Sequence, residues 1–333
     1  MESPKTGGRD VWLDNIKGLL IFLVVFGHVM QKYIHNRASY IYIAFVIIYC
    51  FHMPLFVFLS GYFSKDASKA RDRAFERFLL PYIVWELVWF IVNKVSGWNS
   101  EFNFAVPWFA YWYFVSLFTL CLLLPVLARI RCIVPLLFIL ALVSGLYTVY
   151  GSPFSLGRTI CFSGFFMLGY FCDRGVLETI RKHRIAVLVP ALLTVTALIL
   201  ICLTPYVRSR LGKIERSLWM AEAYRSTPIA AVDGLVIRST IIIAAFFLGA
   251  FVIAVTPRGK SYLSRIGKNS LTVFVLHGFF VEVLNRYVNL DAASFTGIAL
   301  IVLVSLGITL LLSIEPLYRV YCRFMGIVVG IAT

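Results

Sequence analysis

The sequence of 333 residues has few charged side chains and very few acidic ones. Charged residues make up 14% of it, with only 16 Asp and Glu compared with 31 Lys and Arg, and the net charge is +15. Because 60% of the residues are hydrophobic, a single soluble core cannot enclose the apolar surface. The composition therefore excludes an ordinary soluble domain.

Signatures of several enzyme and binding classes are missing as well. The chain has no glycine-rich phosphate loop, no His-Glu-x-x-His metal helix and no Gly-x-Ser-x-Gly elbow. Its seven cysteines lack metal-ligand spacing and an extracellular framework, so we expect free thiols and no bound metal. The positive charge is spread over many loops, which argues against a nucleic-acid partner. The polar N-terminus and the charges within the first apolar run predict no cleavable signal peptide.

Long apolar runs recur along the whole chain. They predict an all-α polytopic membrane protein with about ten transmembrane helices and a single integral-membrane domain over residues 1–333. The predicted spans lie near 12–33, 39–63, 78–95, 107–128, 133–150, 158–172, 185–203, 238–256, 269–286 and 296–318. Most Lys and Arg residues fall on one side of this topology, which places both termini in the cytoplasm and basic loops against anionic membrane lipids.

The first apolar run carries an acid, a base and a histidine on one side of a helix. At about 100° per residue, Asp14, Lys17 and His28 lie within roughly 60° of one another. The helical rise puts His28 about 16 Å beyond Lys17, deep in the hydrocarbon region. Ionisable groups at that depth usually line a site or a water-filled path. A packing histidine with two interfacial charges is the plain alternative.

A second cluster, CFHMPLFVFLSGYF, spans residues 50–63. His52 precedes Pro54, which removes a backbone hydrogen bond, so we expect a distorted turn with polar groups freed inside the membrane. Ser60 and Gly61 allow another backbone to approach closely. A basic stretch follows, with arginines that either clamp phosphate groups or simply obey the positive-inside rule: Arg71, Arg73 and Arg77.

Together these clusters resemble the membrane-bound acyltransferase family 3, and most closely its branch of fucose 4-O-acetylase-like carbohydrate O-acetyltransferases. The resemblance rests on LDNIKGLLIFLVVFGH at 13–28 and FHMPLFVFLSGYF at 51–63, and continues almost to the end of the chain. Further motifs are RFLLPYIVW at 77–85, YWYFVSLFTLCLLLPVL at 111–127, GRTICFSGFFMLGYFCDRG at 157–175 and RIGKNSLTVFVLHGFF at 265–280. Much of the family has arginine where this chain has Lys17, so a bidentate clamp is replaced by a point charge.

The resemblance implies transfer of an acyl group, most often acetyl, from cytosolic acetyl-CoA to a carbohydrate hydroxyl at or beyond a bacterial inner (plasma) membrane. The acceptor would be a polysaccharide, such as an exopolysaccharide, or a lipid-linked sugar. Many relatives carry a soluble esterase-like domain after the membrane part, and we expect none here. Succinyl transfer is an open alternative, and a proton-coupled transporter or flippase is the rival from another class, because broken helices and mid-membrane histidines also suit carriers.

The residues themselves supply suitable chemistry. A neutral histidine can take the proton of a hydroxyl as the hydroxyl attacks a thioester, so His28 is expected to be a base or a transient acyl carrier. Asp14 is too far along the helix to reach His28, and we expect it to order Lys17 and the nearby arginines. The candidate residues are His28, Asp14, His52 and Glu86 for catalysis, Lys17, Arg71, Arg73 and Arg77 for the donor, and Arg158, Trp112 and His277 for the acceptor.

Overall fold

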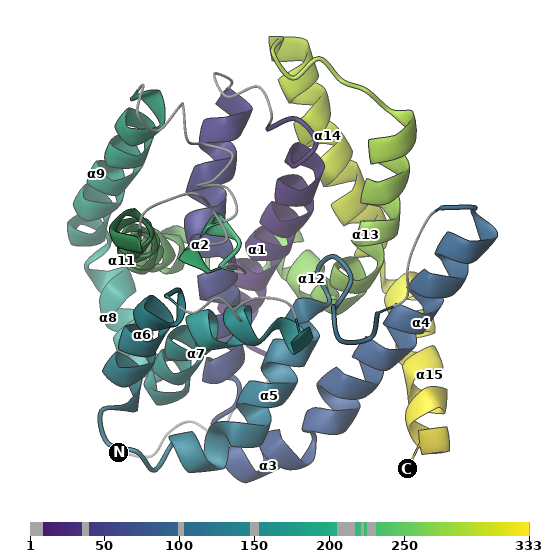
Figure 1. Cartoon of the computed structure of the whole chain (residues 1–333), viewed down its shortest axis with the longest axis horizontal. Coiled ribbons are helices and arrows are strands. Elements are labelled where there is room, and N and C mark those ends of the chain that lie inside the picture. The colour runs from purple at the N-terminus through teal and green to yellow at the C-terminus, as the bar shows by residue number, and fades with distance from the viewer. Residues whose placement is uncertain are drawn as a thin grey trace.

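The computed structural model describes residues 9–34, 40–98, 103–146, 153–204, 217–220, 223–224 and 231–332. Within these ranges the regular elements are all helical and no strand occurs (Figure 1). In chain order they are α1 (Val11–Met30), α2 (Tyr40–Tyr62), α3 (Ala67–Asp72), the π-helix η1 (Phe75–Leu79), α4 (Leu80–Val95), α5 (Trp112–Leu127), α6 (Ile133–Ser144), η2 (Pro153–Ser155), α7 (Leu156–Phe171), α8 (Arg174–Lys182), α9 (Arg184–Leu203), α11 (Ala231–Val255), α12 (Tyr262–Lys268), α13 (Ser270–Tyr287), α14 (Phe295–Leu312) and α15 (Glu315–Ala332).

The predicted class, an all-helical polytopic membrane protein, is confirmed. A helix occupies each of the ten predicted ranges. Among the described residues, however, six helices are long and apolar enough to span a membrane, or seven if α7 and α8, bent by 95°, form one span. At 1.5 Å per residue, α5 and α6 extend about 24 and 18 Å, less than a hydrocarbon core of about 30 Å. The described helices thus support a polytopic membrane protein, with six or seven of them long and apolar enough to span it fully.

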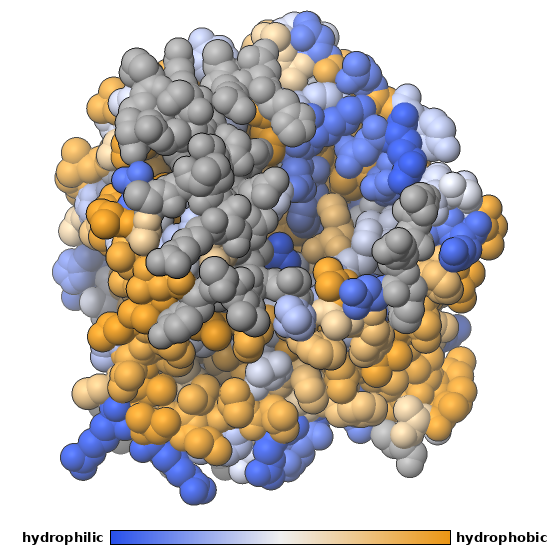
Figure 2. All heavy atoms as spheres, in the orientation of Figure 1, coloured by the Kyte–Doolittle hydropathy of each residue, from blue (hydrophilic) through white to orange (hydrophobic). Residues whose placement is uncertain are grey.

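The surface agrees with a membrane setting. Figure 2 shows hydrophobic side chains gathered in a broad belt across the lower half of the visible face, with hydrophilic side chains below it and at upper right. Large apolar side chains on the outward faces of α6 and α9 are exposed, among them Ile139, Leu193 and Leu200. An apolar belt between two polar rims is what a lipid bilayer requires of a protein that spans it.

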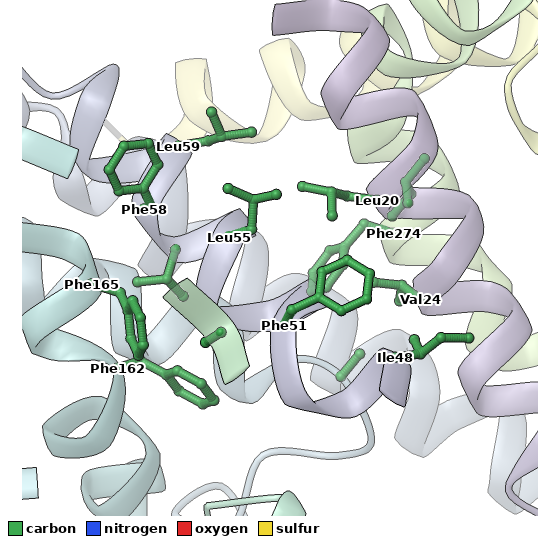
Figure 3. Packing of buried hydrophobic residues seen from close by; sticks show 14 of the residues in the cluster. Leu20, Val24, Ile48, Phe51, Leu55, Phe58, Leu59, Phe162, Phe165 and Phe274 are labelled. Atoms are coloured by element: carbon green, nitrogen blue, oxygen red, sulfur yellow. The ribbon is translucent and has the colours of Figure 1, made fainter. Parts of the chain in front are cut away.

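Helix α2 lies at the centre of the core, between α7 and α1. In Figure 3, Phe162 and Phe165 of α7 approach α2 from one side, and Leu20 and Val24 of α1 from the other. Backbone contact makes the α2–α7 interface tight, because a Cβ added at Gly61 would lie 1.9 Å from the carbonyl oxygen of Phe166. The close backbone approach predicted at Gly61 is confirmed.

Helix α2 continues as one α-helix through Pro54, where the sequence predicted a distorted turn. The ring of His52 lies within hydrogen-bond distance of the Ile48 carbonyl, one turn earlier (2.7 Å). A side chain thus supports this turn next to the proline.

The start of α1 is fixed by a buried asparagine that sequence reasoning passed over. Asn15 donates from Nδ2 to the carbonyls of Pro257 and Gly259, both at 2.8 Å, and its Oδ1 accepts from the Ser261 hydroxyl at 2.6 Å. Ser261 in turn caps α12. Because these bonds tie α1 to the segment before α12, the charged residues beside Asn15 keep a fixed position relative to that segment.

Candidate active site

Two cavities lie end to end along α1 and α2. The first, which we call the basic cavity, has a volume of about 490 Å³ and contains Lys17 and Arg77 in its lining. The second, the histidine cavity, has a volume of about 360 Å³ and contains His28, His52 and Arg158. Both fall in the size range of small-molecule sites. Three residues line both cavities and so mark where they meet: Val24, Met53 and Phe274.

The basic cavity holds an ordered lysine. Asp14 is buried and its two carboxylate oxygens accept separately, one from Lys17 Nζ and one from Arg9 Nε, each at 2.6 Å. Lys17 also lies 5.2 Å from the ring centroid of Phe63. An ammonium has three donor hydrogens, so the pair with Asp14 fixes its position and leaves donors for a ligand. The expectation that Asp14 orders Lys17 agrees with this geometry.

The three arginines expected at this site have different surroundings. Arg77 belongs to the π-helix η1, which continues into α4, and lines the basic cavity. π-Helical turns are uncommon and recur at functional sites. Arg71 instead pairs with Asp72 at 2.9 Å, and Arg73 is the exposed residue directly after α3. Neither Arg71 nor Arg73 lines the cavity.

Two histidines, His28 and His277, are hydrogen-bonded to each other at the histidine cavity. The Nδ1 atom of His277 lies 2.7 Å from the carbonyl oxygen of Phe274 and 3.0 Å from that of Val273. Since a carbonyl only accepts, Nδ1 of His277 carries the hydrogen and its Nε2 accepts in the neutral ring. Nδ1 of His28 lies 2.9 Å from this Nε2, so His28 donates there.

The hydrogen bond to His277 fixes the tautomer of His28. With its hydrogen on Nδ1, the neutral His28 ring keeps a lone pair on Nε2, and the residue lines the cavity. His277 is fully buried and does not line the cavity. The sequence predicts that His277 contacts the acceptor, whereas in the structure it is the hydrogen-bond partner of His28. The same argument places the hydrogen of neutral His52 on Nδ1, because that atom faces the Ile48 carbonyl.

The carboxylate of Glu86 binds the backbone beside the site. Glu86 is buried on α4 and accepts a hydrogen bond from the Trp108 amide, and no contact with either cavity histidine is found for it among the described residues. Trp108 precedes Phe109, whose ring lies 4.3 Å from that of His28. Phe109 has a positive φ of 50°, a strained backbone that recurs at functional sites.

The histidine cavity is also lined by two of the three residues expected to bind the acceptor, Arg158 and Trp112. Arg158 of α7 donates from Nε to the Trp219 carbonyl at 3.2 Å, and its guanidinium lies 5.0 Å from the Trp112 ring centroid. Both Trp112 and Trp219 line the cavity, as does Gln31. The cavity thus combines flat aromatic surface with a cation and one side-chain amide, that of Gln31.

Most of the candidate residues converge, and several important ones were missed. The structure brings His28, His52, Arg158 and Trp112 to one cavity, and Lys17 and Arg77 to the next. Sequence reasoning did not single out Phe109, Phe274 or Asn15. The aromatic run PWFAYWYF at 107–114 and the position of Phe274, one turn before His277, were signals for the first two.

Comparison with known proteins gives one family and two partial relatives. The model of a family described as an acyltransferase domain matches residues 10–314. Nodulation protein NolL of Mesorhizobium japonicum is 37% identical over 100 residues, which are 27% of this chain and 26% of that protein. Nodulation protein NolL of Sinorhizobium fredii is 36% identical over 92 residues, 25% of each chain. The chain therefore spans about a quarter of the length of these relatives. No solved structure matches it.

Proposed function

Since the chain belongs to this acyltransferase family, we propose that it moves an acetyl group from acetyl-CoA to a hydroxyl of a carbohydrate. The observation that carries the proposal is the pair of adjoining cavities, one basic and one presenting the unprotonated Nε2 of His28. A donor with phosphates and an acceptor with hydroxyls need these two environments side by side.

The donor occupies the basic cavity in this proposal. Lys17 and Arg77 bind its phosphate groups by charge-assisted hydrogen bonds, and the pantetheine arm points along α1 towards His28. Because basic residues mark the cytoplasmic side of membrane proteins, we place this cavity and both termini in the cytoplasm of a bacterial inner membrane, with α5 and α6 as short segments of a ten-span topology. The donor then enters from the compartment where acyl-CoA is made.

The reaction follows from the tautomer of His28. The acceptor hydroxyl oxygen attacks the thioester carbonyl carbon while its proton passes to Nε2 of His28. A C–O bond forms, the C–S bond breaks, and the departing thiolate takes up the proton, so the products are an ester and a free thiol. His277 stabilises the positive charge on the His28 ring only through the Nδ1 hydrogen bond, and is a positioning residue.

The histidine cavity suits a sugar ring. Trp112 and Trp219 supply flat apolar surface, while Arg158 and Gln31 supply donors for hydroxyl groups. The motif resemblance to carbohydrate O-acetyltransferases supports the same class of acceptor. A polysaccharide or a lipid-linked sugar at the outer side of the membrane meets this requirement.

The proposal is tested with purified protein in liposomes, radiolabelled acetyl-CoA and cell-surface glycan as acceptor. His28→Ala should reduce transfer by about a hundredfold or more, the usual cost of losing a general base. His183→Ala is the matched control, because His183 lies between α8 and α9 and lines neither cavity. If the wild type transfers no label, or the His28 variant retains full activity, the proposed function is wrong.

A further inference from the structure

One face of each of three helices runs through both cavities. On α1, Lys17 and Ile21 line the basic cavity, Val24 lines both, and His28 and Gln31 line the histidine cavity. The spacings of 4, 3, 4 and 3 residues keep all five on one side of the helix. The cavities are therefore consecutive parts of one track, with Val24 about 10 Å beyond Lys17 and about 6 Å before His28.

The other two helices pass the same level. On α2, which runs the other way, His52 lines the histidine cavity, Met53 lines both, and Phe56 lines the basic cavity. On α13, Ser270 lines the basic cavity and Phe274 lines both. Val24, Met53 and Phe274 thus form one apolar septum between the phosphate-binding end and His28.

The septum has a rigid wall and an adaptable one. The Phe274 ring is held between Tyr113 and Phe114, at centroid distances of 5.4 and 5.1 Å, and the Phe274 carbonyl accepts from His277. Val24 is 2% exposed and, being β-branched, has a stiff side chain. Met53 is flexible and only half-buried. None of the three carries a polar group to satisfy a charge.

We propose that this septum selects the acyl group of the donor, admitting a short uncharged acyl group such as acetyl and rejecting longer or carboxylate-bearing ones. The proposal rests on the proposed function, since the thioester must pass this level to reach His28. An ionised carboxylate loses its hydration there without a partner, which is costly. Each extra methylene of the acyl chain meets packed side chains. A hydrophobic pocket discriminates between substrates that differ by one methylene by about 10- to 200-fold.

The test widens the septum and compares donors. For each variant, kcat/KM is measured with acetyl-CoA, butyryl-CoA and succinyl-CoA. Met53→Ala should raise the butyryl-to-acetyl ratio by about tenfold or more, because space opens where the longer chain is obstructed. Met325→Ala is the matched control, since Met325 lines only the basic cavity and should leave the ratio unchanged. Succinyl transfer should stay low in Met53→Ala because the added space is still apolar.

Val24→Ala and Phe274→Leu widen the same level from α1 and α13 and replace Met53→Ala if that variant does not fold. An unchanged butyryl-to-acetyl ratio in folded variants that still transfer acetyl would overturn the septum as a filter. So would a wild type that uses butyryl-CoA and succinyl-CoA as efficiently as acetyl-CoA. In both cases acyl transfer itself would stand, whereas a wild type inactive with every donor would remove the proposed function.

Discussion

Replacing His277 by leucine tests whether His28 is held in one tautomer. The substitution removes the acceptor for Nδ1 of His28, a bond of 2.9 Å to a fully buried partner. Leaving a buried donor without a partner costs about 1–3 kcal/mol, and each 1.36 kcal/mol corresponds to a factor of ten in rate. We therefore expect kcat to fall about 5- to 150-fold. The KM for acetyl-CoA should stay close to its original value, because Lys17 and Arg77 are untouched.

Steady-state acetyl transfer in liposomes measures both constants. His277→Gln should recover part of kcat, since an amide oxygen can still accept from His28. Thr309→Val serves as the control for a buried hydrogen bond elsewhere, because Thr309 is fully buried on α14 and lines neither cavity. Equal losses in His277→Leu and Thr309→Val, or a loss in His277→Leu that appears only in KM, would refute the tautomer argument.

Three further predictions follow from the cavities and the core. Arg77→Met should raise the KM for acetyl-CoA about tenfold and weaken the salt dependence of donor binding. Arg71→Met lies outside the cavity and should change neither quantity, so equal effects of the two substitutions would contradict the donor site. Arg158→Lys should raise the KM for the glycan acceptor without changing that for acetyl-CoA, and a reversed pattern would contradict its place in the histidine cavity. Gly61→Val should lower the thermal unfolding midpoint by several degrees, because its side chain would overlap the Phe166 carbonyl, and an unchanged midpoint would argue against the α2–α7 contact.

The spacing of polar residues within apolar runs was sufficient to predict several parts of the site. Lys17 and His28 lie on the same helix face, so their arrangement along one track could be predicted from sequence. The pairing of Asp14 with Lys17 is a local contact between residues three apart and was predictable for the same reason. The glycine at position 61 also indicated a close helix contact.

Contacts between segments far apart in the sequence could not be predicted from local residue spacing. The hydrogen bond between His277 and His28 depends on how α13 packs against α1, with the two residues 249 positions apart in sequence. Glu86 binds the Trp108 amide because a loop folds back over α4, and nothing in the local pattern specifies that loop. The bounds of two short apolar helices were not predictable either, since α5 begins at Trp112 rather than near 107 and α6 ends at Ser144 rather than near 150.

The central claim is that an acyl group passes along one track from the basic cavity to the histidine cavity while the phosphate-bearing end of coenzyme A stays in the basic cavity. Sealed liposomes with the protein in one orientation test it most directly, with acetyl-CoA supplied only at the side of Lys17 and Arg77 and the glycan acceptor only at the other. The account predicts acetylated glycan in this arrangement, and no product when the two substrates are exchanged. Product that appears only when donor and acceptor share the side of Lys17 and Arg77 would contradict transfer across the membrane.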